Sequence, residues 1–115
     1  MTSKTRIKGL RNQRKCIKDL ELKGYKVDTV EKTGKFAKVK DLFGLFDLVA
    51  ITDDHLCLVQ VTTNRPHNHK RFHKFRVEFQ VPYLKILQYV WVDRKGWIVF
   101  EYKINGVRVK EDLRK

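Results

Sequence analysis

The stretch that decides the fold is FDLVAITDDHLCLVQVT, residues 46–62. It holds two short runs, 46–52 and 56–62, in which both alternating faces are largely apolar, and the pair Asp53-Asp54 separates them. Strands that are apolar on both faces are typical of the covered centre of a sheet. The stretch therefore predicts a hairpin in the middle of the sheet.

A two-residue turn at this aspartate pair predicts an antiparallel register in which Val49 faces Leu58 and Asp47 faces Gln60. Directly opposed side chains lie about 4.5–5.5 Å apart at Cβ, close enough to share one metal ion. Thr62, two residues after Gln60, is expected to point to the same face. Strand ends are often polar with no functional reason, so the pattern is open to both interpretations.

Outward from this hairpin, the patterns predict further elements at 3–23 (helix), 25–33 (strand), 68–79 (helix), 86–92 and 97–104 (hairpin) and 107–109 (short strand). Helices interleaved with a central apolar hairpin indicate an α/β fold with a single mixed β-sheet, helices on both faces and the order αβββαββ. Residues 1–115 are expected to form a single domain, because this length leaves no room for a second core.

The first predicted helix places Leu10, Ile17 and Leu20 along one face. Gln13 lies between them and is expected to face the sheet rather than solvent. Such a glutamine is either a hydrogen-bonded buried amide or a functional group that projects toward the strand carrying Asp47.

The formal net charge is +13, and it is unevenly distributed along the chain. Residues 1–24 carry a net +6 and residues 65–80 a net +4, whereas residues 25–64 carry a net −1. Clustered cations favour a polyanionic partner because they release counterions from phosphates; selection for solubility alone is the alternative. The residues predicted to bind nucleic acid are Arg11, Arg14, Lys18, Arg65, Lys70, Arg71 and Lys74.

Cys16 and Cys57 both lie within apolar patterns, where a free cysteine behaves as a small hydrophobic residue. We expect them to be reduced core residues of a cytoplasmic protein. No stretch is long enough to span a membrane, and no apolar core follows the basic residues 1–8 as in a secretory signal.

The second predicted helix carries two further patterns. His69 and His73 have an i, i+4 spacing that can bind zinc, but a solvated basic helix is the simpler interpretation. Phe72, Phe75 and Phe79 have helical spacing and are expected to be core rather than base-stacking residues. On the last hairpin, Tyr89, Trp91 and Trp97 are expected to pack or to form an interface.

Three short runs resemble a known family: RKCIKDLELKGY at 14–25, DLFGLFDLVAI at 41–51 and LVQVT at 58–62. The first is similar to the first helix and strand entry of archaeal Holliday junction resolvases. The other two resemble the core of the PD-(D/E)xK nuclease superfamily. The resemblance implies a restriction-endonuclease-like fold, a DNA partner that can be branched, and a two-fold homodimer.

In that superfamily a helix Glu, a strand Asp and a Glu-x-Lys on the next strand assemble one or two divalent metals. The resemblance places the Asp on Asp47, the helix Glu on Gln13 and the Glu-x-Lys on Gln60-Val61-Thr62. Only Asp47 matches by residue type. Two amides in place of carboxylates remove two formal negative charges, although Mg²⁺ prefers anionic oxygen ligands.

Asp41, six residues before Asp47, is expected to supply a second carboxylate. With Asp47 and Gln60 it would hold Mg²⁺ or Mn²⁺. The missing lysine has three candidate replacements, Lys70, His69 and Lys40. Two hypotheses follow: a junction resolvase-like endonuclease with a degenerate metal site, or a non-catalytic DNA-binding protein on the same fold. A module for protein assembly is a third and weaker hypothesis.

Overall fold

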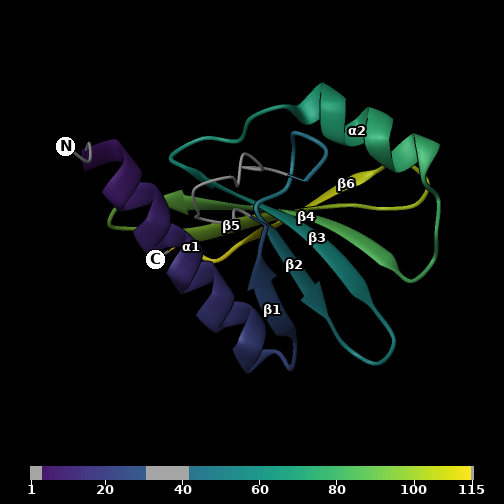
Figure 1. Cartoon of the computed structure of the whole chain (residues 1–115). Coiled ribbons are helices and arrows are strands. Elements are labelled where there is room, and N and C mark those ends of the chain that lie inside the picture. Colours follow the sequence, from purple (N-terminus) through teal and green to yellow (C-terminus); the bar gives the residue numbers. More distant parts are fainter. Residues whose placement is uncertain (1–3, 31–41, 115) are drawn as a thin grey trace, which may run out of the picture.

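The computed structural model of the chain describes residues 4–30 and 42–114. It contains one six-stranded sheet and two helices, arranged as Figure 1 shows. The elements are α1 (Lys4–Leu22), β1 (Lys26–Thr29), β2 (Leu48–Ile51), β3 (Leu56–Thr63), α2 (His69–Glu78), β4 (Leu84–Val92), β5 (Gly96–Tyr102) and β6 (Arg108–Asp112).

The strand order in the sheet follows the chain, from β1 at one side to β6 at the other. Strands β3 and β4 are parallel, and the other neighbouring pairs are antiparallel. A parallel pair needs a long crossover, and α2 supplies it here. The prediction of an α/β fold with one mixed sheet is confirmed.

The predicted register of the central hairpin is also confirmed, since Val49 pairs with Leu58 and Ile51 with Leu56. The turn is closed by Thr52, whose N–H donates to the His55 carbonyl at 2.9 Å. The Thr52 hydroxyl also donates to Asp54 at 2.9 Å, and this bond is the main reason why the pKa of Asp54 lies below its usual value.

The predicted order αβββαββ left out β6, for which only a short strand at 107–109 was expected; β6 pairs with β5 from Ile98 to Tyr102. Every residue of β6 is exposed. An edge strand with no buried face carries no apolar alternation, so its sequence pattern shows only the short run at 107–109.

Two apolar clusters hold the helices to the sheet. Cys16 and Leu20 of α1 pack with Val59 of β3, whereas Phe72 of α2 packs with Leu58. Members of the two clusters alternate along β3 and β4, so their side chains leave the sheet on opposite sides. The face opposite α1 is also lined by rings, and Phe72 stacks on Tyr102 with centroids 5.3 Å apart.

The buried stripe of α1 differs from the predicted one. Leu10 is 38% exposed, and the fully buried positions are Asn12, Cys16 and Leu20. These lie four residues apart and therefore on one face. Relative to the prediction, α1 is rotated about its axis, so that Asn12 rather than Leu10 lies on the face that packs against the sheet.

The aromatic hairpin is part of the core. Tyr89 and Trp97 are buried, and the half-buried Trp91 packs beside them with its ring edge-on to Trp97 at 5.0 Å. Lys15 lies over the Trp91 ring at 3.8 Å. Of the two roles predicted for this hairpin, packing is the one observed. No helix among the described residues is both long and apolar enough to cross a membrane.

Both cysteines are free and buried, as predicted. Burial raises the pKa of the Cys16 thiol far above its usual value, and it also raises the pKa of Cys57. Because the thiolate is the reactive form, we expect neither thiol to react with an aromatic disulfide reagent at neutral pH until the protein is unfolded. Absorbance of the released thiolate measures this, and rapid labelling of the native protein would contradict it.

Candidate nucleic-acid interface

Asp47, which directly precedes β2, is hydrogen-bonded to β3 and to the residue that follows β1. Its N–H donates to the Val59 carbonyl at 2.8 Å, and its own carbonyl accepts from the Val30 N–H at 2.9 Å. The half-buried carboxylate accepts from the Val61 N–H at 2.9 Å. Backbone and side chain of this residue together fasten the start of β2 to β3 and to the end of β1.

The predicted opposition of Asp47 and Gln60 lies just beyond the observed strand ladder. The ladder between β2 and β3 stops at Leu48 and Val59. Beyond it, the bonds of Asp47 go to Val59 and Val61, the two neighbours of Gln60 in the chain. The carboxylate extends the pairing of β2 with β3 beyond the ladder.

Gln60 is engaged with a second glutamine. Gln88 is fully buried in β4, and its Nε2 donates to Gln60 Oε1 and to the His67 carbonyl, each at 2.7 Å. The Gln88 Oε1 atom has no hydrogen-bond partner among the described residues. Sequence reasoning missed Gln88, although a polar residue in the middle of the apolar run 84–92 was a usable signal.

Gln13 and the Gln60 side chain lie on opposite sides of the sheet. The α1 cluster includes Val59, with Val61 packed against it, whereas Gln60 alternates with them and points to the other side of the sheet. Gln13 itself is only half-buried. The buried amide of α1 is Asn12, which the sequence analysis missed and which donates to Thr63 Oγ1 at 2.9 Å.

The remaining predicted site residues have separate roles or lie elsewhere. The Thr62 hydroxyl donates to the Arg65 carbonyl at 3.0 Å and so orders the loop after β3. Asp41 and Lys40 lie outside the described residues. The ring of His69 is hydrogen-bonded to the Tyr102 hydroxyl at 3.0 Å, and burial lowers the pKa of this histidine.

The two histidines of α2 face the last hairpin, and no third metal-ligating side chain joins them among the described residues. His73 Nδ1 lies 3.2 Å from the Gly106 carbonyl, and its ring is 6.4 Å from the ring of His69. Their i, i+4 spacing thus connects α2 to β5 and to the turn before β6.

The residues that the structure describes do not by themselves supply a full ligand set for a divalent cation. Across residues 4–30 and 42–114, no three His, Cys, Asp or Glu side chains gather in a way that could hold a metal ion. Mg²⁺ prefers several anionic oxygens, and the described part of the predicted site offers only the Asp47 carboxylate. The amide oxygen of Gln60 accepts one hydrogen bond, from Gln88, and carries no formal charge.

The predicted nucleic-acid-binding residues, in contrast, are all at the surface. Arg11, Arg14 and Lys18 of α1 are exposed and form no ion pair with any described residue. On α2 and the loop before it, Arg65, Lys70, Arg71 and Lys74 are also exposed. Lys74 lies 4.0 Å from Glu78, at the limit of an ion pair.

A fixed polar network lies where β3 and β4 end. Lys8 of α1 is paired with Asp93, which also accepts from Asn64 Nδ2 at 3.2 Å. The Asp93 N–H donates back to Asn64 Oδ1 at 3.0 Å. The bond from Lys8 is the main reason why the pKa of Asp93 lies below its usual value. This network links the first half of α1 to the ends of β3 and β4, on the same helix as the exposed cations.

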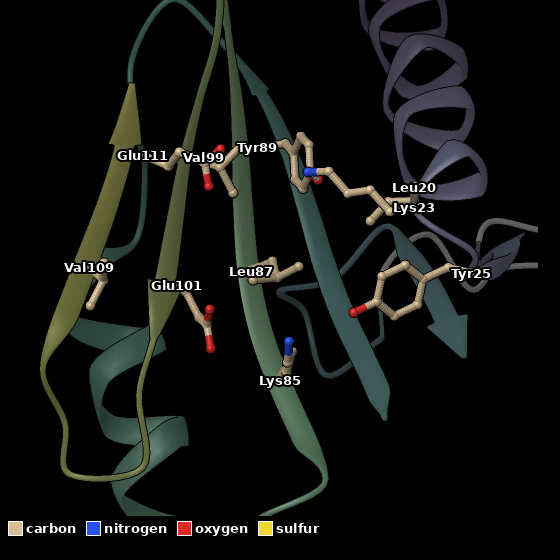
Figure 2. A pocket seen from close by; sticks show the side chains of 10 residues that line it. All are labelled: Leu20, Lys23, Tyr25, Lys85, Leu87, Tyr89, Val99, Glu101, Val109 and Glu111. Atoms are coloured by element: carbon tan, nitrogen blue, oxygen red, sulfur yellow. Dashed lines mark hydrogen bonds between the residues drawn. The ribbon is translucent and has the colours of Figure 1, made fainter. Parts of the chain in front are cut away.

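A separate pocket of about 200 Å³ opens beside the end of α1, toward the other end of the sheet. Figure 2 shows Lys23 and Tyr25 on one side of it and strands β4, β5 and β6 on the other. Its charged groups are Lys23, Lys85, Glu101 and Glu111. Because cations and carboxylates balance there, the pocket does not favour a polyanion.

No protein-family model matches this sequence, and no curated protein is similar to it in sequence. Its structure is similar to that of a Holliday junction resolvase from the archaeal hyperthermophile Archaeoglobus fulgidus, with a TM-score of 0.55. The chain has this resolvase's fold. The match covers 90% of this chain and 88% of the resolvase at 16% sequence identity, so it establishes the fold alone.

Proposed function

We propose that this chain is a nucleic-acid-binding protein, with DNA as its partner, that contacts phosphates through the cations of α1 and α2. The observation that supports this most directly is the exposure of Arg11, Arg14 and Lys18 with no ion pair among the described residues. Exposed cations without carboxylate partners are free to neutralise phosphates and to release counterions. Lys70, Arg71 and Lys74 extend the same chemistry to α2.

The test is DNA binding as a function of salt. Fluorescence anisotropy with a labelled duplex and a labelled four-way junction gives the association constant over a series of salt concentrations. If the cations named above each contact one phosphate, the logarithm of this constant should fall with the logarithm of salt with a slope of about −5. Weak binding at low salt would contradict the proposal. Comparing the four-way junction with the duplex tests the preference for branched DNA that the resemblance implies. Analytical sedimentation tests whether the protein is a homodimer.

A second candidate, metal-dependent DNA cleavage, is favoured by the position of Asp47, held half-buried at the start of β2 where the resemblance places the family's aspartate. In that candidate Asp47, Gln60, Thr62 and Gln13 would form the catalytic site. Asp41 would have to supply a second carboxylate for Mg²⁺ or Mn²⁺.

Asp47→Asn separates the two candidates. An asparagine keeps an oxygen that can accept from the Val61 N–H, so we expect the fold and DNA binding to be retained. Under the binding proposal, wild type and variant show the same background cleavage when Mn²⁺ is added. Asp53→Asn is the matched control, because it removes one exposed carboxylate from the hairpin turn. Cleavage that is lost in Asp47→Asn and retained in Asp53→Asn would establish the second candidate.

A further inference from the structure

Three phenylalanine rings form a row beside α2, which we call the aromatic ridge: Phe43, Phe75 and Phe79. The Phe75 centroid lies 5.5 Å from that of Phe43 and 4.8 Å from that of Phe79. Phe43 is 64% exposed and Phe79 is 48% exposed, while Phe75 is half-buried between them. The prediction of a core position is therefore wrong for Phe79. Large apolar groups gathered at a surface are typical of an interaction site.

The backbone presents Phe43 outward in an unfavourable conformation. Phe43 has φ 57° and the following Gly44 has φ 67°. The left-handed region is rare for a bulky residue, and strained residues of this kind concentrate at functional sites. The core beneath is already filled by Phe46 and Phe72, whose rings pack edge-on at 5.5 Å. Phe43 is therefore not needed to complete it.

Cations border the aromatic ridge. Arg71 lies one helical turn before Phe75, and its Nη2 atom is only 3.1 Å from the position a Cβ would take on Gly44. Its guanidinium group therefore lies against the turn that carries Phe43. Lys70 and Lys74 are exposed on the same helix.

We propose that the aromatic ridge stacks unpaired bases of a nucleic-acid strand whose phosphates contact Lys70, Arg71 and Lys74. Rows of aromatic rings beside cations suit this ligand, because every base has a stacking face and every nucleotide a phosphate. A second copy of this chain is disfavoured as the occupant, since each copy carries a formal net charge of +13. The inference rests on the proposed function and specifies its substrate class as nucleic acid with unpaired bases.

The test compares a continuous DNA duplex with the same duplex carrying a short unpaired bulge that contains 2-aminopurine. The wild-type protein should bind the bulged duplex roughly 5- to 100-fold more tightly, which corresponds to the stacking of one base. Stacking should also change the 2-aminopurine fluorescence. Phe43→Ala/Phe79→Ala should remove both effects while the affinity for the continuous duplex stays unchanged.

Phe43→Trp should retain the preference for the bulge, because an indole ring also offers an aromatic face on which a base can stack. Tyr83→Ala is the matched control, since Tyr83 is 61% exposed and lies outside the aromatic ridge. Circular dichroism confirms that each variant is folded.

Equal wild-type affinity for the two duplexes would overturn the inference and leave the proposed function standing. A preference that survives Phe43→Ala/Phe79→Ala would also overturn it. If this double variant instead changes only the sedimentation behaviour, the aromatic ridge is a protein interface and the inference is wrong. A wild-type protein that binds neither duplex refutes the proposed function together with the inference.

Discussion

Replacing Lys70, Arg71 and Lys74 together by glutamine is expected to weaken DNA binding by roughly 100- to 1,000-fold near 0.1 M salt. All three side chains are exposed on α2, so the loss reflects phosphate contacts rather than misfolding. The salt slope should become shallower by about 0.9 for each phosphate contact removed. Anisotropy titrations at several salt concentrations measure both quantities.

The matched control replaces Lys26, Lys103 and Lys110 by glutamine. These residues lie on β1, after β5 and on β6, and they are exposed. Both triple variants lower the formal net charge of the chain by three. If binding depends on the α2 surface, the control should lose much less affinity. Equal losses in the two variants would show that net charge alone drives binding, and the assignment of α2 would be wrong.

Phe72→Ala is expected to lower the free energy of unfolding by about 3–5 kcal/mol, the usual cost of removing a fully buried aromatic ring. Phe72 is 0% exposed and connects α2 to the sheet. Its ring stacks on Tyr102 and packs edge-on against Phe46. The loss should appear in urea denaturation as a lower midpoint with an unchanged slope.

Phe79→Ala is the control on the same helix, since Phe79 follows the last turn of α2 and is about half exposed. Its cost should stay below about 1 kcal/mol. If Phe72→Ala fails to fold, Phe72→Leu keeps most of the apolar volume and gives a smaller loss that can be measured. Similar losses for Phe72→Leu and Phe79→Ala would show that Phe72 does not anchor α2.

The central hairpin could be predicted because two independent signals agree there. The runs 46–52 and 56–62 are apolar on both faces, and the short turn between them permits one register. The basic surfaces could also be predicted, since charge clustering is visible in the sequence. Both the apolar pattern and the charge clustering involve residues close together in the chain, so they can be detected in one sequence without knowledge of tertiary contacts.

The contacts of the candidate site residues were harder to predict from the sequence. Few apolar residues mark α1, so its sequence is compatible with two different buried faces. The observed face combines Cys16 and Leu20 with Asn12, whose amide donates to Thr63. The geometry of Asp47 depends on a break in the ladder that no periodicity reveals. The partner of Gln60 comes from Gln88 across a parallel pair, a contact between distant parts of the chain.

The free edge of β6 affects whether sheets of different molecules can pair at high protein concentration. No described strand pairs with its outer side, and Arg108, Lys110, Glu111 and Asp112 give that edge closely spaced charges of both signs. An incoming strand from another molecule would have to desolvate several of these charges to form a ladder. The charged edge of β6 therefore disfavours edge-to-edge aggregation of the sheet, even though β6 adds no buried residue to the core.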